Sequence, residues 1–457
     1  MTRGWTRAKR HLGLALAVAV LAGCGGGEAP DARSDDEQEG PISHEHSGRT
    51  RWVRTVRSMG DSDAPVAVAQ DAEGHVLTAG NHRTLLDFGQ GPRSGTSGAS
   101  VLVVSKYSPE GTHLWAQLFE APQRGGASPY VRAQSLTVDK QGNILLTGVQ
   151  SGGLKLGTKT LPPGAFLAKL DPRGTPLWAR HLPANATELV VDAQGHITLA
   201  GQLTSKADFG NGRPLQGNGN PYLVRLDPEG GLRWVLMDST RGTAMDLTQD
   251  DSGDLYLVGG MFPQSSRLLA PFLTRVSAEG ERLWTRPLEG ATGLAMSVAA
   301  HGDHVVVSGY FTGQFPFNGE TLSAPTTRGF ALAYGRDGKE RWGLLLGSTW
   351  GLVAMDQGSG VVMAGRYTGG EDFGLGAGRL EGFPGATNLY VMRLHRPTGK
   401  LHWMRTFRSA SALPVDLSAA RQGAGALVGT FRAPVFLDTG TLYPGAGTNT
   451  FLLQLER

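Results

Sequence analysis

In the 457-residue sequence cysteine is scarce, and long apolar runs, helical periodicity and known catalytic motifs are missing. Each of these shortages excludes a class of protein. The sequence contains a single cysteine, Cys24, so the chain cannot build an internal disulfide framework. Its apolar runs are shorter than the ~20 residues that a transmembrane helix needs, and no helical periodicity runs through it. A Gly-x-Ser-x-Gly nucleophile elbow is missing, as is a glycine-rich loop followed by a helix. The sequence therefore offers no catalytic constellation.

The N-terminus has the three parts of a signal peptide. A basic segment that ends at Arg10 is followed by an apolar run of eleven residues, Leu12 to Ala22, and then by Gly23 and Cys24. The Leu-Ala-Gly-Cys quartet resembles the lipobox of bacterial lipoproteins, in which the cysteine is acylated and becomes the new N-terminus. We expect residues 1–23 to be a lipoprotein signal peptide. The acyl chains on Cys24 would then hold the protein on the outer membrane, on its periplasmic or surface side.

Removal of that peptide changes the charge of the protein. The formal net charge of +3 includes four basic residues and no acids before Cys24, so the chain from Cys24 onward carries −1. No nucleic-acid partner is expected of such a chain. Residues 24–47 are acidic and lack apolar periodicity, which predicts a disordered tether. We expect the pair His44 and His46, on such a segment, to hold no metal.

Seven tryptophans recur through the rest of the chain at spacings of 50 to 63 residues, and each follows a glycine by four positions. The glycine suits a turn that requires positive φ, and the tryptophan then lies on the next strand. The seven pairs are Gly48 and Trp52, Gly111 and Trp115, Gly174 and Trp178, Gly230 and Trp234, Gly280 and Trp284, Gly338 and Trp342, and Gly399 and Trp403.

Other parts of the unit repeat as well. A strand-like run ends in an Asp-x-x-Gly turn, a β-branched strand follows, and a long variable loop leads to a third strand such as 166–170. Four strands per ~58 residues predict an all-β, seven-bladed β-propeller over residues 48–457. The chain stops at a third strand, 451–455, and residues 48–56 match the missing fourth strand. We expect the N-terminal strand to complete the last blade and the propeller to be monomeric.

The repeat resembles the SBBP-type β-propeller repeats of bacterial surface and secreted proteins, especially those of myxobacteria. The match rests on units such as residues 142–148 and 166–178, and on the phrase Asp-Phe-Gly at Asp87, Asp208 and Asp372. The resemblance implies a propeller in the cell envelope and no reaction. In that phrase we expect the phenylalanine to pin the long loop to its blade.

A second, more distant resemblance is to quinoprotein propellers. Residues 398–403, Thr-Gly-Lys-Leu-His-Trp, look like their tryptophan docking motif. The dehydrogenases of that group use adjacent cysteines beside their cofactor, which this chain cannot supply, so no cofactor is expected.

Two features point to a binding site. Alignment of the innermost strands places Glu188, Asp246 and Asp416 at one repeat position, which we expect near the mouth of the central channel. Trp350 is the other feature, because it lies between blades where an indole could stack on a ligand. Solvated acids and a packed core indole are the alternative interpretations. The longest loops, 81–99, 202–220, 310–327 and 366–387, should share the face that carries this site.

The leading functional hypothesis is a lipid-anchored, non-enzymatic binding or scaffold protein whose partner is a protein or glycan on the loop face. One alternative is an outer-membrane assembly partner that resembles the quinoprotein-like lipoprotein of the barrel-assembly machine. The other is an envelope lyase or hydrolase built from the channel acids.

Overall fold

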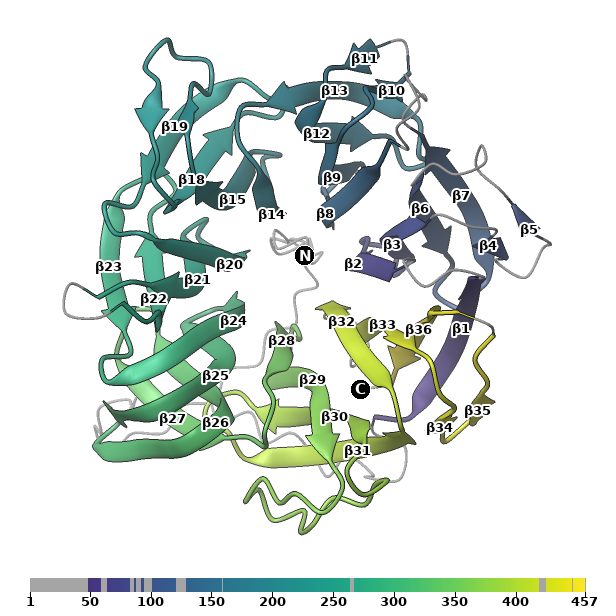
Figure 1. Cartoon of the computed structure of the whole chain (residues 1–457), viewed down its shortest axis with the longest axis vertical. Helices are drawn as coiled ribbons and strands as arrows, with labels where there is room; N and C mark the ends of the chain where they lie inside the picture. The colour runs from purple at the N-terminus through teal and green to yellow at the C-terminus, as the bar shows by residue number, and fades with distance from the viewer. Residues whose placement is uncertain are drawn as a thin grey trace, which may run out of the picture.

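The described chain consists of short antiparallel strands arranged around one central axis (Figure 1). The structure is a computed structural model, and it describes residues 48–58, 64–82, 86–87, 92–93, 101–120, 129–157, 159–263, 267–418, 425–445 and 447–456. The predicted signal peptide, Cys24 and the tether lie outside these residues. Within the described ranges, no helix is long and apolar enough to span a membrane.

The described strands form seven four-stranded blades, which confirms the predicted all-β, seven-bladed propeller. Five blades are separate four-stranded sheets, and in the other two a small hairpin extends the sheet to six strands. Blade 1 contains β2 (Ala64–Gln70), β3 (Val76–His82), β6 (Val101–Tyr107) and β7 (His113–Phe119). Blade 2 contains β8 (Val131–Val138), β9 (Ile144–Gln150), β12 (Gly164–Leu170) and β13 (Pro176–Leu182). Blade 3 contains β14 (Ala186–Val191), β15 (Ile197–Leu203), β18 (Asn220–Leu226) and β19 (Leu232–Met237). Blades 4 and 5 contain β20 (Gly242–Gln249), β21 (Leu255–Met261), β22 (Ala270–Val276) and β23 (Arg282–Pro287); and β24 (Ala291–His301), β25 (His304–Phe317), β26 (Glu320–Gly335) and β27 (Glu340–Leu345). Blades 6 and 7 contain β28 (Gly351–Met355), β29 (Gly360–Thr368), β30 (Thr387–His395) and β31 (Leu401–Ser409); and β32 (Ala412–Ser418), β33 (Gly425–Phe431), β36 (Asn449–Leu455) and β1 (Thr50–Ser58).

The first strand of each blade lies innermost, and these seven strands surround the axis of the ring (Figure 1). We call the region around this axis the central channel. The turns between first and second strands and between third and fourth strands share one face of the ring, which we call the turn face. The connections between second and third strands and between successive blades share the opposite face, which we call the loop face. The faces of the strands that look toward neighbouring blades are apolar, and they bury clusters of side chains from adjacent blades.

The ring closes through the N-terminal strand, as the sequence predicts. β1 pairs antiparallel with β36, with Val53 opposite Leu453 and Val56 opposite Thr450. Both Trp52 and Val56 of β1 are buried. Strands from the two ends of the described chain thus form one sheet. Without this closure, the third strand of blade 7, β36, would have an unpaired edge.

The repeated tryptophans and glycines join neighbouring blades. The indole on the outermost strand of one blade lies against the turn glycine of the next blade, so that Trp52 packs on Gly111 and Trp342 on Gly399. All seven glycines of the repeat lie at positive φ, and each contacts the tryptophan of the preceding blade. Gly48, in blade 7, contacts the tryptophan of blade 6. The indole nitrogen of Trp52 also donates to the carbonyl oxygen of Pro109 at 2.9 Å. One side chain therefore fills the space between two blades and fixes a turn of the next.

The long loops contain more regular structure than the sequence predicted. The segment 310–327 is a continuation of β25 and β26 rather than a loop. Four small hairpins occupy the equivalent place in other blades: β4 (Leu86–Asp87) with β5 (Pro92–Arg93), β10 (Leu154–Leu156) with β11 (Lys159–Leu161), β16 (Lys206–Ala207) with β17 (Leu215–Gln216), and β34 (Val435–Leu437) with β35 (Gly440–Leu442). Two of them pair with the outermost strand of the preceding blade, β34 with β31 and β4 with β1.

Candidate functional site

The three acids that share one repeat position lie in the wall of the central channel. Glu188, Asp246 and Asp416 belong to the innermost strands β14, β20 and β32. Each directly follows a β-bulge, where the register with the second strand shifts. A bulge redirects the next side chain, and here it lies within the strand. The acids therefore lie part-way along their innermost strands, and their place near the mouth of the central channel stays a prediction.

Two of these carboxylates connect neighbouring blades. Asp246 accepts hydrogen bonds from the backbone amides of Leu247 and of Val298 in blade 5, both at 2.7 Å. Asp416 accepts them from Leu417 at 2.8 Å and from Val68 in blade 1 at 2.7 Å. These acids thus have a structural role, because each joins its own innermost strand to that of the following blade.

Glu188 has a different set of partners. Its Oε2 accepts a hydrogen bond from the hydroxyl of Ser135 in blade 2 at 2.9 Å. Ser135 occupies the equivalent repeat position, and Ser297, at the same position in blade 5, accepts from the amide of Val353 in blade 6 at 3.2 Å. The repeat position is therefore a place where blades are joined to one another, by carboxylates in some blades and hydroxyls in others.

The electrostatics show that the three carboxyl groups act on one another. Burial raises the pKa of Glu188 well above its usual range, and the negative charges of Asp246 and Asp416 raise it further. Burial raises the pKa of Asp246 to about 6, although the hydrogen bonds from Val298 and Leu247 lower it. Burial likewise raises the pKa of Asp416. The channel therefore favours carboxyl groups that hold a proton more tightly than they would in water.

Trp350 lies in the connection between blades 5 and 6, as the sequence indicated. Its indole is partly buried and packs against the apolar cluster that blades 6 and 7 share. The neighbouring Thr349 donates its hydroxyl to the carbonyl oxygen of Arg366 at 2.6 Å, which fixes this connection to β29. Trp350 as a whole is only partly buried, so a role for it in stacking on a ligand stays a prediction.

The Asp-Phe-Gly phrases hold the long loops, as expected, in the two places where the structure describes them fully. Phe209 and Phe373 are buried, and they pack on the tyrosines Tyr222 and Tyr390 of the third strands at ring distances of 5.2 and 5.1 Å. Asp372 accepts the amide of Gly374 at 2.8 Å. Phe88 and Gly89 of the first phrase lie outside the described residues.

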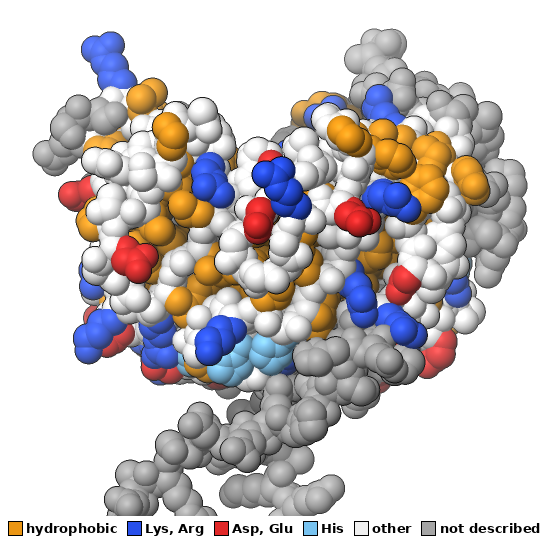
Figure 2. All heavy atoms as spheres, turned by 90° about the horizontal axis from the view of Figure 1, so that it is seen from below, with side chains coloured by type: hydrophobic (Ala, Val, Ile, Leu, Met, Phe, Trp, Pro, Cys, Tyr) orange, Lys and Arg blue, Asp and Glu red, His pale blue; other side chains and the backbone are white. Residues whose placement is uncertain are grey.

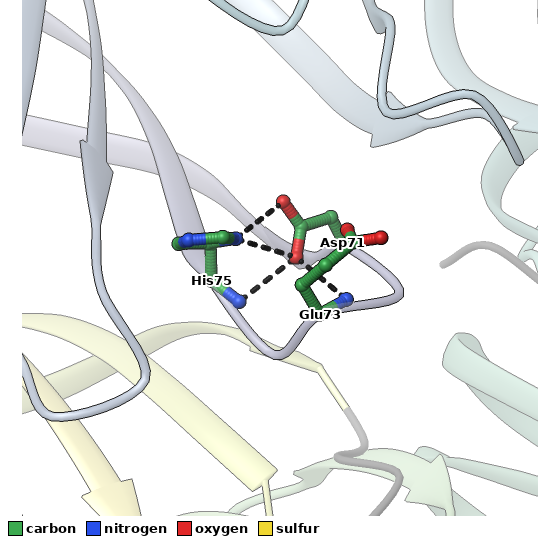
Figure 3. Close-up of side chains that lie close together, drawn as sticks. All are labelled: Asp71, Glu73 and His75. Atoms are coloured by element: carbon green, nitrogen blue, oxygen red, sulfur yellow. Dashed lines mark hydrogen bonds and ion pairs between the residues drawn. The ribbon is translucent and has the colours of Figure 1, made fainter.

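One group of side chains has the composition of a metal site. Oxygen and nitrogen atoms of Asp71, Glu73 and His75 lie within 4.8 Å of one another at the first turn of blade 1 (Figure 3). The carboxylate of Asp71, however, already accepts the amides of Glu73 and His75 at 3.1 and 2.8 Å and pairs with Lys106 at 2.8 Å. In Figure 3 the bonds reach the backbone nitrogen of Glu73 and not its carboxylate.

The same arrangement recurs in other blades without a second acid. Asp139 accepts the amides of Gln141 and Asn143 and pairs with Lys169 at 2.9 Å. Asp192 and Asp356 pair in the same way with Arg225 and Arg393. The group at Asp71 is therefore a repeated turn structure, in which a buried basic residue from the third strand neutralises the turn aspartate.

The sequence interpretation missed this partner, although the signal was present. Lys169 and Arg225 stand at the same place in the two third strands that define the repeat, one residue before the final leucine. A basic residue at an inward position of an apolar strand requires a buried counter-charge. The basic residue and the turn aspartate recur together from unit to unit, and this shared recurrence would have predicted the ion pairs between them.

The structure also contains a cleft that the sequence did not indicate, which we call the blade 6–7 cleft. It has a volume of about 880 Å³ and lies between β31 of blade 6, the hairpin β34–β35 and the start of β1. Its walls contain Arg49, Thr50, Glu381, Arg405, Thr406, Phe407, Arg408, Phe436, Leu437, Asp438, Thr439 and Glu456.

No family model and no curated protein sequence matches the chain. Solved structures resemble its fold. A chain of the crystal structure of a mitotic checkpoint complex has a TM-score of 0.50 and 10% identity, over 97% of this chain and 100% of that one. The WD40 domain of Neurospora crassa Pan2 has a TM-score of 0.46 and 9% identity, over 90% of this chain and 97% of that domain. A catalytically inactive virginiamycin B lyase from Staphylococcus aureus has a TM-score of 0.45 and 8% identity, over 88% of this chain and 98% of the lyase. At 10% identity, the likeness to the checkpoint-complex chain shows a shared fold alone.

Proposed function

We propose that the chain is a lipid-anchored cell-envelope propeller that acts as a non-enzymatic binding or scaffold protein. In this proposal Cys24 holds the protein on the outer membrane, and the loop face is directed away from that membrane toward a protein or glycan partner. The repeats support the envelope location, because they resemble the SBBP-type repeats of bacterial surface proteins. The observation that carries the proposal is the place where the tether joins the propeller.

Gly48 occupies the third-to-fourth-strand turn of blade 7, although that turn is made of two separate chain ends. Its amide donates to the carbonyl oxygen of Glu456 at 3.2 Å, as Gly111 donates to Ser108 at 2.8 Å in the continuous turn of blade 1. The amide of Glu456 donates to the carbonyl oxygen of Arg49 at 2.8 Å and completes the same pattern. The described chain therefore begins on the turn face.

This attachment point supports an orientation. A lipid on Cys24 would pull on the turn face, opposite the hairpins of the loop face. A tether of 24 residues, as the sequence predicts, has a root-mean-square span of roughly 25–30 Å as a random coil. That span keeps the turn face near the membrane and leaves the loop face accessible, which is the arrangement that a binding platform requires.

A photo-crosslinking experiment on intact cells tests the proposal. A photoreactive residue is placed at exposed Arg213 or Arg379 on the loop face and, as matched controls, at exposed Arg173 or Lys339 on the turn face. We expect discrete crosslinked partners from the loop-face positions and lipid or no adducts from the turn-face positions. Protein or glycan adducts confined to the turn-face positions would overturn the proposal.

A further inference from the structure

The walls of the blade 6–7 cleft are held in place by contacts between separate parts of the chain. The hairpin β34–β35 pairs with the end of β31, where Arg408 lies opposite Phe436. At the turn of this hairpin, the carboxylate of Asp438 accepts the backbone amide of Thr50 in β1 at 3.0 Å. The volume of about 880 Å³ lies within the range of ~300–1,000 Å³ that is typical of small-ligand sites, which are mostly pre-formed. These contacts make the cleft a fixed feature of the flank between blades 6 and 7.

An exposed pair of aromatic rings lies at the cleft. Phe436 is part of its wall, and Phe383 of blade 6 meets the Phe436 ring edge to face at 5.8 Å. Each residue is 39% exposed, and large apolar side chains that remain exposed side by side mark a binding surface. The buried side chain of Asn388 fixes Phe383, because its Oδ1 accepts the Phe383 amide at 3.2 Å and its Nδ2 donates to the Phe383 carbonyl oxygen at 3.3 Å. Rings that are fixed and partly exposed offer a flat apolar surface to a ligand.

The polar walls of the cleft carry equal numbers of positive and negative side chains. Three arginines and three acids line it: Arg49, Arg405, Arg408, Glu381, Asp438 and Glu456. Guanidinium groups only donate hydrogen bonds, and carboxylates only accept them. A ligand with a charge of either sign would meet three side chains of its own sign. A hydroxyl group both donates and accepts, so a neutral ligand that is rich in hydroxyls can use both sets of side chains.

The same walls favour a sugar over a peptide. A peptide binds mainly through apolar or aromatic side chains that enter well-packed pockets, whereas Phe436 is the one exposed apolar residue among the walls. A sugar ring presents C–H groups on its face, which pack on an aromatic ring, and hydroxyls at its edge, which reach charged side chains. Arg408 is exposed in such a place, because its guanidinium lies 5.9 Å from the centre of the Phe436 ring. The flank of the ring drawn in Figure 2 shows hydrophobic side chains gathered beside Lys and Arg and near Asp and Glu, which is the combination that a sugar requires.

We propose that the blade 6–7 cleft binds a neutral oligosaccharide. One sugar ring packs with its C–H face on Phe436, and its hydroxyls bond to the charged side chains of the walls, among them Arg408 and Glu381. The site lies on the flank of the ring. It depends neither on a lipid at Cys24 nor on the loop-face partner proposed above.

A glycan array probed with the full chain, purified in a detergent that has no sugar head group, tests this inference. The array carries neutral oligomers of glucose, mannose, galactose and N-acetylglucosamine, with sulfated and uronate-containing oligosaccharides as their charged counterparts. We expect at least one neutral oligosaccharide to bind more tightly than its charged counterparts, because the charged ones meet side chains of like charge in the cleft.

Variants of the walls locate the bound sugar. Phe436→Ala and Glu381→Gln should each weaken its binding about 10-fold, whereas Phe436→Tyr keeps an aromatic ring and should stay within about 3-fold of wild type. The matched controls are Tyr443→Ala, an exposed aromatic outside the cleft walls, and Glu229→Gln, an exposed acid of blade 3. Both controls should bind the sugar like wild type, and equal melting temperatures show that the variants fold.

The packing on Phe436 has a readout of its own. The ring current of an aromatic side chain shifts the NMR signals of protons above its face upfield. The C–H protons on one face of the bound sugar should therefore shift upfield with wild type and lose this shift with Phe436→Ala. The inference is overturned if no neutral oligosaccharide binds, if charged oligosaccharides bind more tightly, or if the cleft variants bind the sugar as wild type does. Sugar binding that Trp350→Ala removes and the cleft variants leave intact would place the sugar on the loop face, and it overturns the inference as well.

Discussion

Gly48 and the indole of Trp403 are in such close contact that a Cβ added to the glycine would lie 2.6 Å from two ring carbons. The two residues come from the beginning of the described chain and from its sixth blade. The same contact exists between every pair of neighbouring blades, so the closing junction is built like the other six. The ring therefore depends on Gly48 as much as on a glycine in a continuous turn.

We expect Gly48→Ala to destabilise the whole propeller. The added methyl group must displace the Trp403 ring, and alanine at a φ of +73° is strained. Together these effects should cost about 2–5 kcal/mol in free energy of unfolding, measured by denaturant titration. Gly370→Ala is the matched control, because Gly370 has a φ of +91° with open space around it and should cost about 1–2 kcal/mol. Equal losses in the two variants would show that the Trp403 contact carries no specific energy.

This junction could be predicted from the sequence for a simple reason. The offset between glycine and tryptophan is constant in all seven units, so a missing tryptophan strand at one end of the chain and a spare one at the other stand out. The sequence did not reveal that each indole contacts the glycine of the following unit and not its own. Contacts between blades are invisible to a pattern that is read within one repeat.

The anchor is tested by Cys24→Ser, which removes the thiol that would be acylated. We expect the variant to accumulate as the unprocessed precursor or to appear in soluble fractions, measured by fractionation and by metabolic labelling with a fatty acid. A single acyl chain holds a protein weakly, and two or more hold it firmly, so partial acylation should give partial release. An unlabelled variant that stays on membranes through a high-salt wash would contradict the anchor.

The turn group at Asp71 gives a prediction that separates metal binding from structure. Asp71→Ala removes the acceptor for two backbone amides and leaves the largely buried Lys106 without its partner, at a cost of about 3–5 kcal/mol. Glu73→Ala, at an exposed residue of the same group, should leave the melting temperature unchanged. Treatment with a chelator should leave it unchanged as well. A fall in melting temperature on chelation that Glu73→Ala abolishes would establish a metal site.

For the channel acids, an alignment of the repeats predicts the shared position but not the hydrogen-bond partners. The alignment placed Glu188, Asp246 and Asp416 at one repeat position, and the structure puts all three on innermost strands at equivalent bulges. Their partners could not be predicted, because Val298 and Val68 offer backbone amides, which every residue except proline possesses. Only the distance between blades shows which amide a carboxylate reaches.

The last prediction concerns the pH dependence that Glu188 gives to stability. Its pKa in the folded protein is raised by burial and by Asp246 and Asp416, so the folded state binds its proton more tightly than the unfolded state does. Wild-type stability should therefore fall as pH rises from the ordinary value of 4.5 through the raised value, and then level off. Glu188→Gln removes this charge and keeps an oxygen that can accept the Ser135 hydroxyl. The variant should match wild type near pH 4 and melt at a higher temperature at pH 8, measured by calorimetry, while Glu229→Gln, at an exposed acid of the same blade, should show no such divergence. A Glu188→Gln variant that is less stable than wild type at pH 8 would mean that the ionised carboxylate is stabilised in the channel, as it would be by a bound cation.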